Sequence, residues 1–350
     1  MKLRKMKRKK FLGIILFSPI VYALSTSMKM IYSAIKAVVV KAKESRFGIP
    51  TPFLGVNPND LKLSSKDTNG KLSTFYYKGV QKVGPLLHYH LYQDEVFYVI
   101  QGQYVFQLGE EKQMLNSGDV IFLPRNIPHT WVQISEVGEM FYFLQPAGKM
   151  EEFFLKMTEL GANGTDEDRT KIGEDAGILN AGPGLNATDN HIFTDKLTKG
   201  FVVISGESRT GEKILINGAS PNDVKVSGND TGNELSIFEY RGIGKGGPPL
   251  HVHPNQDEIF YITEGEYLFQ CAEDKISLTI GDMIFLPRGV PHTWAQLTNT
   301  GKLLYFFQPS GKMEDFFRTI GNQKGDLSPE ESNKLWEDHE MKIVGSPLEI

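Results

Sequence analysis

Short segments in which apolar and aromatic side chains alternate with polar ones recur along most of the chain. One begins at Glu95 and reads EVFYVIQG, and the next follows directly as QYVFQL, ending at Leu108. Turn-forming residues interrupt the pattern at Gly102, at 116–118 (Asn-Ser-Gly) and at 124–128 (Pro-Arg-Asn-Ile-Pro). A period of two predicts β-strands, and short strands broken by regular turns are typical of a β-sandwich or a β-barrel.

This pattern occurs twice in the chain. When the sequence is shifted by 163 residues, His88 falls on His251 and Phe154 falls on Phe317. Within this stretch, 37 of the 67 aligned positions are identical, and no gap is needed. Composition alone does not produce such identity, so the chain contains a duplicated unit.

The repeat extends beyond the alternating segments. Residues 165–185 overlie residues 328–348 at the same offset. In the second copy, Ser328, Pro329 and Glu331 form a helix start, with a capping serine, proline at the first helical position and glutamate at the third. Each unit is therefore predicted to end in a short helical tail.

Length and composition fit this organisation. The 350 residues suit two domains of roughly 150 residues each. The net charge is −4, but seven of the first ten residues are lysine or arginine, so the rest of the chain is clearly acidic. An acidic body argues against a nucleic-acid partner. The single cysteine, Cys271, excludes an internal disulfide and a cysteine zinc cluster.

The N-terminus has the pattern of a targeting segment. A basic stretch, 2–10, precedes an apolar run, 11–24, which Pro19 interrupts. The run is too short to span a bilayer comfortably and resembles the apolar region of a secretory signal peptide. The alternative is an uncleaved anchor that attaches the chain to a membrane through residues 11–24. Both interpretations predict that the β units work outside the cytoplasm, either secreted, periplasmic or held at the membrane.

Six of the eight histidines lie at equivalent places in the two units. In each unit a His-x-His pair is followed five residues later by a glutamate, and a third histidine closes a Gly-Asp-x-Ile-Phe-Leu-Pro-Arg segment. Alternate side chains of a strand share one face, so both imidazoles of the pair point the same way. The pattern predicts one metal site per unit, formed by His88, His90, Glu95 and His129, and by His251, His253, Glu258 and His292.

Three imidazoles and one carboxylate suit a divalent transition metal, namely Fe, Mn, Ni, Co, Cu or Zn, and leave coordination positions open for a substrate or for oxygen. The alternative is that the His-x-His pair is simply a polar face of a strand. Two complete ligand sets at a constant offset argue against it. Another alternative is a metal that is only structural or is bound in one unit.

These two segments resemble the paired signature motifs of the cupin superfamily. The pattern His-x-His-x4-Glu-x6-Gly holds in both units and ends at Gly102 and Gly265. Departures are small: Asn126 stands where the family usually has glycine, and Gln133 and Gln296 replace the usual terminal asparagine. The resemblance implies an all-β fold of two tandem cupin barrels (double-stranded β-helix, or jelly-roll, barrels), each followed by a short helical tail.

The repeat and the resemblance together predict the domain boundaries. They are a signal peptide or membrane anchor (1–27), a lead-in segment (28–50), cupin barrel 1 (51–155), a helical tail and linker (156–190), cupin barrel 2 (191–318) and a helical C-terminal tail (319–350).

Continuing the alternation inward predicts an aromatic pocket around each metal, which suits a flat organic ligand. The alternative is that half or more of these side chains are simply barrel core. The predicted pocket residues are Phe97, Trp131, Gln133, Phe260, Trp294 and Gln296.

Among two-unit cupins with this ligand set, the chain resembles quercetin 2,3-dioxygenase-like proteins. That resemblance implies a small-molecule substrate that is flavonol-like or otherwise an enolisable aromatic, with O2 as the second substrate. It also implies that Glu95 and Glu258 serve as catalytic residues, each both a metal ligand and a proton acceptor. The physical logic is general, because a carboxylate beside a cation can take a hydroxyl proton while the cation stabilises the oxyanion.

Two other functions remain open. Oxalate-decarboxylating two-unit cupins share the ligands, but they need a small pocket with a mobile acid lid, which the aromatic lining does not suggest. A non-catalytic extracytoplasmic protein that binds a metal or a small molecule would consume no oxygen with any polyphenol. Different residues at the two barrel mouths predict unequal access, and Gly289, which keeps the family pattern, favours the second barrel. A homodimer is a further expectation that the sequence leaves open.

Overall fold

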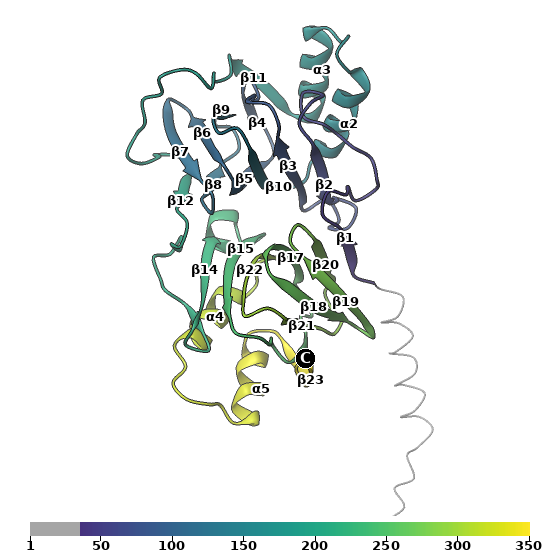
Figure 1. Ribbon diagram of the computed structural model, residues 1–350, viewed down its shortest axis with the longest axis vertical. Coiled ribbons are helices and arrows are strands. Elements are labelled where there is room, and N and C mark those ends of the chain that lie inside the picture. Colours follow the sequence, from purple (N-terminus) through teal and green to yellow (C-terminus); the bar gives the residue numbers. More distant parts are fainter. Residues whose placement is uncertain (1–35) are drawn as a thin grey trace, which may run out of the picture.

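In the computed structural model, which describes residues 36–350, each half of the chain forms two facing antiparallel sheets. The two halves are stacked along the long axis, the first above the second in Figure 1. The predictions of an all-β fold and of two tandem barrels with short helical tails are confirmed.

The first barrel contains β2 (Asn59–Leu63), β3 (Ser73–Gly79), β4 (Leu87–His90), β5 (Asp94–Gln101), β6 (Gln103–Leu108), β7 (Glu111–Asn116), β8 (Val120–Leu123), β9 (His129–Gln133), β10 (Gly138–Gln145) and β11 (Ile178–Gly182). Its sheets have the orders β12-β8-β5-β10-β3-β2 and β11-β4-β9-β6-β7. Helices α2 (Met150–Leu160) and α3 (Asp166–Ala176) precede β11.

The second barrel contains β13 (Leu215–Ile216), β14 (Ser220–Val226), the 3-10 helix η1 (Gly228–Thr231), β15 (Ser236–Ile243), β16 (Leu250–Val252), β17 (Asp257–Glu264), β18 (Glu266–Cys271), β19 (Asp274–Thr279), β20 (Met283–Leu286), β21 (His292–Gln296), β22 (Thr300–Gln308) and β23 (Lys342–Gly345). Its sheets have the orders β1-β20-β17-β22-β15-β14-β13 and β19-β18-β21-β16-β23. Helices α4 (Met313–Gly321) and α5 (Pro329–Asp338) precede β23.

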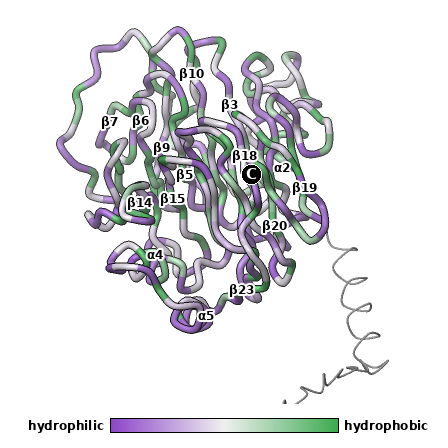
Figure 2. Tube along the Cα trace, turned by 60° about the horizontal axis from the view of Figure 1, so that its bottom comes forward, coloured by the Kyte–Doolittle hydropathy of each residue, from purple (hydrophilic) through white to green (hydrophobic). Residues whose placement is uncertain are grey.

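Strand β5 shows how the period of two builds two cores at once. Phe97 and Val99 pack into the interior of barrel 1. Val96 and Tyr98, on the other face, pack into a cluster shared by both barrels. Both faces of the strand are therefore buried, which explains its nearly continuous apolar sequence. Figure 2 shows the same mixture of hydrophobic and hydrophilic positions along the strands.

Aromatic side chains dominate the contact between the barrels. The ring of Phe141 lies 4.4 Å from that of Tyr261, and the ring of Phe143 lies 4.9 Å from that of Phe306. Tyr98 also donates a 2.7 Å hydrogen bond across the interface to the fully buried Glu239 carboxylate. The barrels are consequently joined by a packed core as well as by the chain.

Each unit contributes its leading strand to the other unit. Strand β1 (Val38–Val40) pairs with β20 of barrel 2, and β12 (Phe201–Val203), at the equivalent repeat position, pairs with β8 of barrel 1. The strand β1 within the predicted lead-in thus completes a sheet of barrel 2, and the start of the predicted second domain completes a sheet of barrel 1. This exchange has no signature in either strand alone.

Buried polar contacts fasten both exchanged strands. After β1, the backbone N–H of Ala42 donates to Asp282 at 2.9 Å, and Lys41 pairs with the same carboxylate at 2.8 Å. After β12, the N–H of Ser205 donates to Asp119 at 2.8 Å. The equivalent aspartates of the two units therefore hold equivalent strands.

The helical tails lie at the two outer ends of the molecule, with α2 and α3 at one end and α4 and α5 at the other (Figure 1). The predicted capping of α5 by Ser328, with Pro329 following, is present, and Thr165 caps α3 in the same way. Beyond α3 the chain turns through Gly177 in a left-handed conformation and returns as β11, which pairs with β4. Each tail therefore ends in a strand beside its own His-x-His segment.

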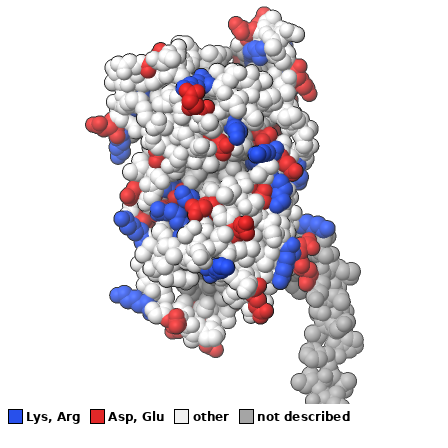
Figure 3. Space-filling view, in the orientation of Figure 1, with Lys and Arg blue, Asp and Glu red and all other residues white. Residues whose placement is uncertain are grey.

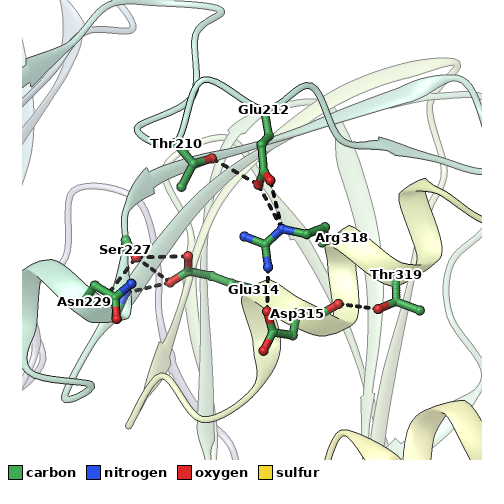
Figure 4. Close-up of polar contacts among 9 residues, drawn as sticks. Thr210, Glu212, Ser227, Asn229, Glu314, Asp315, Arg318 and Thr319 are labelled. Atoms are coloured by element: carbon green, nitrogen blue, oxygen red, sulfur yellow. Dashed lines mark hydrogen bonds and ion pairs between the residues drawn. The ribbon is translucent and has the colours of Figure 1, made fainter.

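Glu314 and Arg318 anchor helix α4 to the barrel (Figure 4). Glu314 accepts hydrogen bonds from the Ser227 hydroxyl at 3.0 Å and from the Gly228 N–H at 2.6 Å. Arg318 pairs with Glu212 at 3.0 Å. In barrel 1, Glu151 makes the equivalent contact with Ser64 at 2.8 Å, so both outer helices start from a fixed point.

The face of the molecule in Figure 3 carries acidic and basic side chains interspersed. Within residues 36–350, no helix is both long enough and apolar enough to cross a membrane. The predicted signal peptide or anchor, including the run 11–24, lies outside the described residues and stays a prediction, as does the extracytoplasmic location.

Candidate metal centres

The backbone register brings the predicted ligands of each barrel together from both of its sheets. Strand β4 pairs with β9 so that His88 lies opposite His129, and β16 pairs with β21 so that His251 lies opposite His292. The glutamate comes from the facing sheet, at the start of β5 or β17. Each centre therefore lies in a barrel interior rather than on a strand face.

The donor atoms of each set are close enough to share one ion, because all four lie within 4.8 Å of one another. In barrel 1, a Glu95 oxygen lies 3.1 Å from His129 Nε2, and the other lies 3.6 Å from His90 Nε2. In barrel 2, a single oxygen, Glu258 Oε2, lies 2.9 Å from His292 Nε2 and 3.6 Å from His253 Nε2.

Backbone carbonyl groups fix the tautomer of two histidines in each set. The Nδ1 atoms of His88 and His129 lie 2.8 and 2.9 Å from the carbonyl oxygens of Leu86 and Ile127, two residues earlier. His251 and His292 make the same contacts at 2.8 Å. Because Nδ1 donates its proton to a carbonyl, Nε2 keeps a free lone pair directed at the centre, as metal-ligating histidines require.

The electrostatics also fit a cation. Burial, reinforced by the neighbouring imidazoles, lowers the pKa of His88 and of His90 to about 3. The same causes hold the pKa of His251 and His253 well below the ordinary value. Neutral imidazole is the form that binds metal, so these four histidines have no proton to lose near neutral pH.

Both ring nitrogens of the buried His90 lack a hydrogen-bond partner among the described residues. Unpaired buried polar groups are costly, and a shared ion would give His90 Nε2, the nitrogen nearer Glu95, a partner. The residues present therefore fit one divalent metal ion per barrel.

An ion pair that sequence reasoning missed positions each glutamate. Arg125 donates to both oxygens of Asp94, at 3.0 and 2.7 Å, and Arg288 holds Asp257 with the same distances. Each aspartate directly precedes the metal-site glutamate. The bidentate pair ties the end of the Gly-to-His segment to the strand that carries the glutamate, which fixes the carboxylate relative to the last histidine. The repeat could have indicated this ion pair, because both the aspartate and the arginine are identical in the two units.

A cavity lies against each centre, with a volume of about 210 Å³ in barrel 1 and about 310 Å³ in barrel 2. Aromatic and aliphatic side chains form most of each wall. Glu95 is the only carboxylate among the described residues that line the first cavity, and Glu258 is the only one in the second.

The predicted pocket residues divide into two groups. Phe97 and Trp131 line the first cavity, and Trp294 lines the second. Phe260 instead packs in the core between Trp294 and Tyr305.

The predicted glutamines do not line either cavity. Gln133 donates to the carbonyl oxygens of Gly79 and Ser135, and Gln296 donates to those of Gly244 and Thr298. Both are fully buried and bridge backbone segments of the barrel. The alternation from the last histidine therefore predicted that these side chains face the barrel interior, but not how far they lie from the metal centre.

The outer helices supply the cavity walls that sequence reasoning missed. Met150, Phe153, Phe154 and Met157 of α2 line the first cavity. Met313, Phe316, Phe317 and Ile320 of α4 line the second. The identity of Phe154 with Phe317 across the repeat was the available signal, but it did not reveal that the helices fold back over the metal.

The fold and the site define a class: a protein of two β-barrels, each with a buried metal centre of three histidines and one glutamate. The family model described as "Cupin domain" matches the chain twice, at residues 79–144 and 242–307. The cupin domain therefore occurs twice in the chain, once in each barrel, which supports its assignment as a two-unit cupin.

Comparisons with characterised proteins agree with this assignment. The chain is 23% identical to quercetin 2,3-dioxygenase of Bacillus subtilis over 262 residues, which cover 71% of this chain and 77% of that one. It is 28% identical to quercetin 2,3-dioxygenase of Aspergillus japonicus over 195 residues, which cover 54% of this chain and only half of the fungal one. Among solved structures, oxalate decarboxylase from Bacillus subtilis superposes with a TM-score of 0.55 at 14% identity, covering 89% of this chain and 88% of that one. At that identity the likeness concerns the fold alone.

Proposed function

We propose that this protein is a metal-dependent dioxygenase that acts on a flavonol-like or otherwise enolisable aromatic substrate. The observation that carries the proposal is the cavity of barrel 1, in which His88, His90 and Glu95 of the ligand set lie at a mostly apolar, aromatic wall. The similarity to two quercetin 2,3-dioxygenases supports it. The proposal includes a divalent transition metal in each barrel, which is one of Fe, Mn, Ni, Co, Cu and Zn.

The residues of the site divide the work between them. The histidines and Glu95 would hold the ion in barrel 1, and when bound the ion would supply Lewis acidity toward the substrate hydroxyl and redox chemistry toward O2. The apolar wall orients the aromatic ring and keeps water out, which strengthens the electrostatic interactions at the centre. Glu95 accepts the proton of the enolic hydroxyl. Both atoms of O2 enter the substrate, so no external reductant is required.

The absence of a second acid in the described lining separates this proposal from an oxalate decarboxylase. Decarboxylation leaves a carbanion equivalent that must be protonated, and an acid near the metal would provide that proton. Glu95 is the one carboxylate on the first cavity's wall, and it belongs to the ligand set. A dioxygenase needs only this one carboxylate. The lining of the first cavity therefore favours a dioxygenase over an oxalate decarboxylase.

The test is oxygen uptake by the protein after separate reconstitution with Fe, Mn, Co, Ni, Cu and Zn, with a flavonol and, in parallel, with oxalate. We expect uptake with the flavonol that depends on the metal, together with incorporation of labelled O2 into the product. Release of CO2 from oxalate without oxygen uptake would favour the decarboxylase. Bound metal without turnover of either substrate would favour a non-catalytic binding protein.

A further inference from the structure

The two metal centres differ at a position of the repeat that lines both cavities. Gly173 of α3 lines the first cavity, whereas Trp336 of α5 occupies the equivalent position and lines the second. The Trp336 ring lies 4.9 Å from the His251 ring and 4.9 Å from the Phe316 ring, and it is 93% buried, with an exposed fraction of 7%. The metal ligand in barrel 2 is therefore covered by an indole that barrel 1 lacks.

The exposure of the equivalent ligands reflects this difference. His251 is buried, with an exposed fraction of 3%. His88 is half-buried as a residue, and it lines the first cavity together with Arg169, Thr170 and Gly173 of α3. Thr170 is exposed and Arg169 is half-buried, so the first cavity reaches the surface beside this helix.

A second difference between the repeats, at another wall of the cavity, places the aromatic side chain in barrel 1 instead of barrel 2. In barrel 1, Phe53 stacks on Trp131 at 5.5 Å and contacts the Tyr77 ring edge at 5.9 Å. In barrel 2 the equivalent residue is Ile216, and the cavity there extends along the segment 243–249, where Ile243 is 63% exposed. Each barrel is thus closed by an aromatic side chain where the other is open.

The polar groups in the first cavity define the ligand that would fit. Arg169 is its only cationic side chain among the described residues, and its Nη2 is held by the carbonyl oxygen of Gly161 at 2.7 Å. Asn59, 1% exposed, accepts a 2.7 Å hydrogen bond at Oδ1 from the Tyr142 hydroxyl, and its Nδ2 has no partner among the described residues. An unpaired buried donor and a fixed cation around an apolar wall select an apolar ring system with an oxygen acceptor and an anionic substituent.

We infer that the two barrels are not equivalent: barrel 1 admits an extended aromatic ligand to its metal past Gly173, and Trp336 closes the same path in barrel 2. This inference specifies which centre serves the proposed dioxygenase and so rests on that function for its substrate. The difference in access itself concerns the protein alone. It opposes the preference for the second barrel that Gly289 suggested.

Access can be tested without turnover. In the metal-free protein, diethyl pyrocarbonate modifies neutral imidazoles at an accessible nitrogen, and peptide mass spectrometry reports each histidine separately. We expect His88 to react faster than His251, and Trp336→Gly to raise the rate at His251 to that of His88. Trp336→Phe keeps an aromatic ring over His251 and should retain the protection, which separates loss of the cover from loss of the fold. Equal rates at His88 and His251 in the unaltered chain would overturn the inference.

The reciprocal variant tests the ligand. Gly173→Trp places the indole in barrel 1, and in the metal-loaded protein it should weaken binding of a flavonol, followed by the fluorescence of Trp131, by about tenfold or more. Asp175→Trp puts the same side chain on an exposed position of α3 and should leave binding unchanged. Unchanged flavonol binding in Gly173→Trp would contradict the inference. If unaltered protein binds no flavonol but His88 and His251 still differ in reactivity, the proposed substrate fails while the difference in access stands.

Discussion

At the residue scale, eight side chains form two nearly identical clusters that could each hold a metal ion. The sequence predicted this grouping because the motif occurs twice, so each copy checks the other. The limits of that prediction are also at this scale. Gln133 lies on the expected face of β9 but too far along the strand to reach the metal. Arg169 could not be predicted, because it comes from a helix whose position depends on tertiary packing. Alternation assigns a face to a residue, whereas depth within a barrel depends on strand tilt and on the elements that cover it.

Removing one ligand should empty one site only. His90→Ala is expected to lower the metal content from two ions per chain to one, and His253→Ala to do the same through the other barrel. The reason is that each set is complete within its own barrel. Elemental analysis after dialysis measures this, and the double variant should hold no metal. Retention of two ions by His90→Ala would show that this histidine is not a ligand.

Lys62 links stability to pH. Its side chain is fully buried, and it donates to the carbonyl oxygens of Lys41 at 2.9 Å and Glu44 at 2.7 Å, just after strand β1. Burial lowers its pKa from 10.5 to about 8. Between these values the unfolded chain binds the proton and the folded chain does not, so stability rises with pH, by up to about 3 kcal/mol.

The contribution of Lys62 is therefore lost as pH falls through about 8. Urea unfolding at pH 7 and pH 10 should show that Lys62→Met lacks this rise relative to the unaltered chain. Lys71→Met, at an exposed position, is the control and should show the rise in full. An identical pH dependence in Lys62→Met and in the unaltered chain would exclude the effect.

At the element scale, the strand exchange is the feature that sequence did not reveal. β1 and β12 are three residues long and apolar, and neither sequence indicates which barrel it joins. The duplication predicted that the two strands would be equivalent. Only the packing of one barrel against the other makes the foreign sheet the nearer edge.

This exchange predicts that a substitution in one leading strand destabilises the other barrel. Val39 packs against the core of barrel 2, and Val202, its equivalent, packs against that of barrel 1. Val39→Asp should therefore loosen barrel 2 by about 2 kcal/mol, and Val202→Asp should loosen barrel 1, because each introduces a charge against an apolar core. Hydrogen exchange at β18 and β20, compared with β6 and β8, distinguishes the two barrels. If Val39→Asp accelerated hydrogen exchange in barrel 1 alone, this result would contradict the strand exchange between the barrels.

At the scale of the whole molecule, the sequence predicted two barrels with helical tails, and the structure adds how they cooperate. The barrels share one aromatic core, and the leading strands cross between them. The helical tails, which line the metal cavities, lie at opposite ends of the molecule (Figure 1). The cavities are therefore separate, and each has its own walls. Such separation allows a duplicated unit to diverge at one centre while the other keeps the shared fold intact. Whether two copies of the chain associate stays a prediction.

In the proposed dioxygenase, the metal-site glutamates serve as proton acceptors. The most direct test is oxygen uptake with a flavonol by the double variant Glu95→Gln and Glu258→Gln, which retains the shape of each side chain but not its basicity. With its metal content measured and found retained, the variant should lose uptake by about 10²-fold or more, the usual contribution of a general base. Uptake at the rate of the unaltered protein would show that neither carboxylate takes the proton, and it would exclude this role for Glu95 and Glu258.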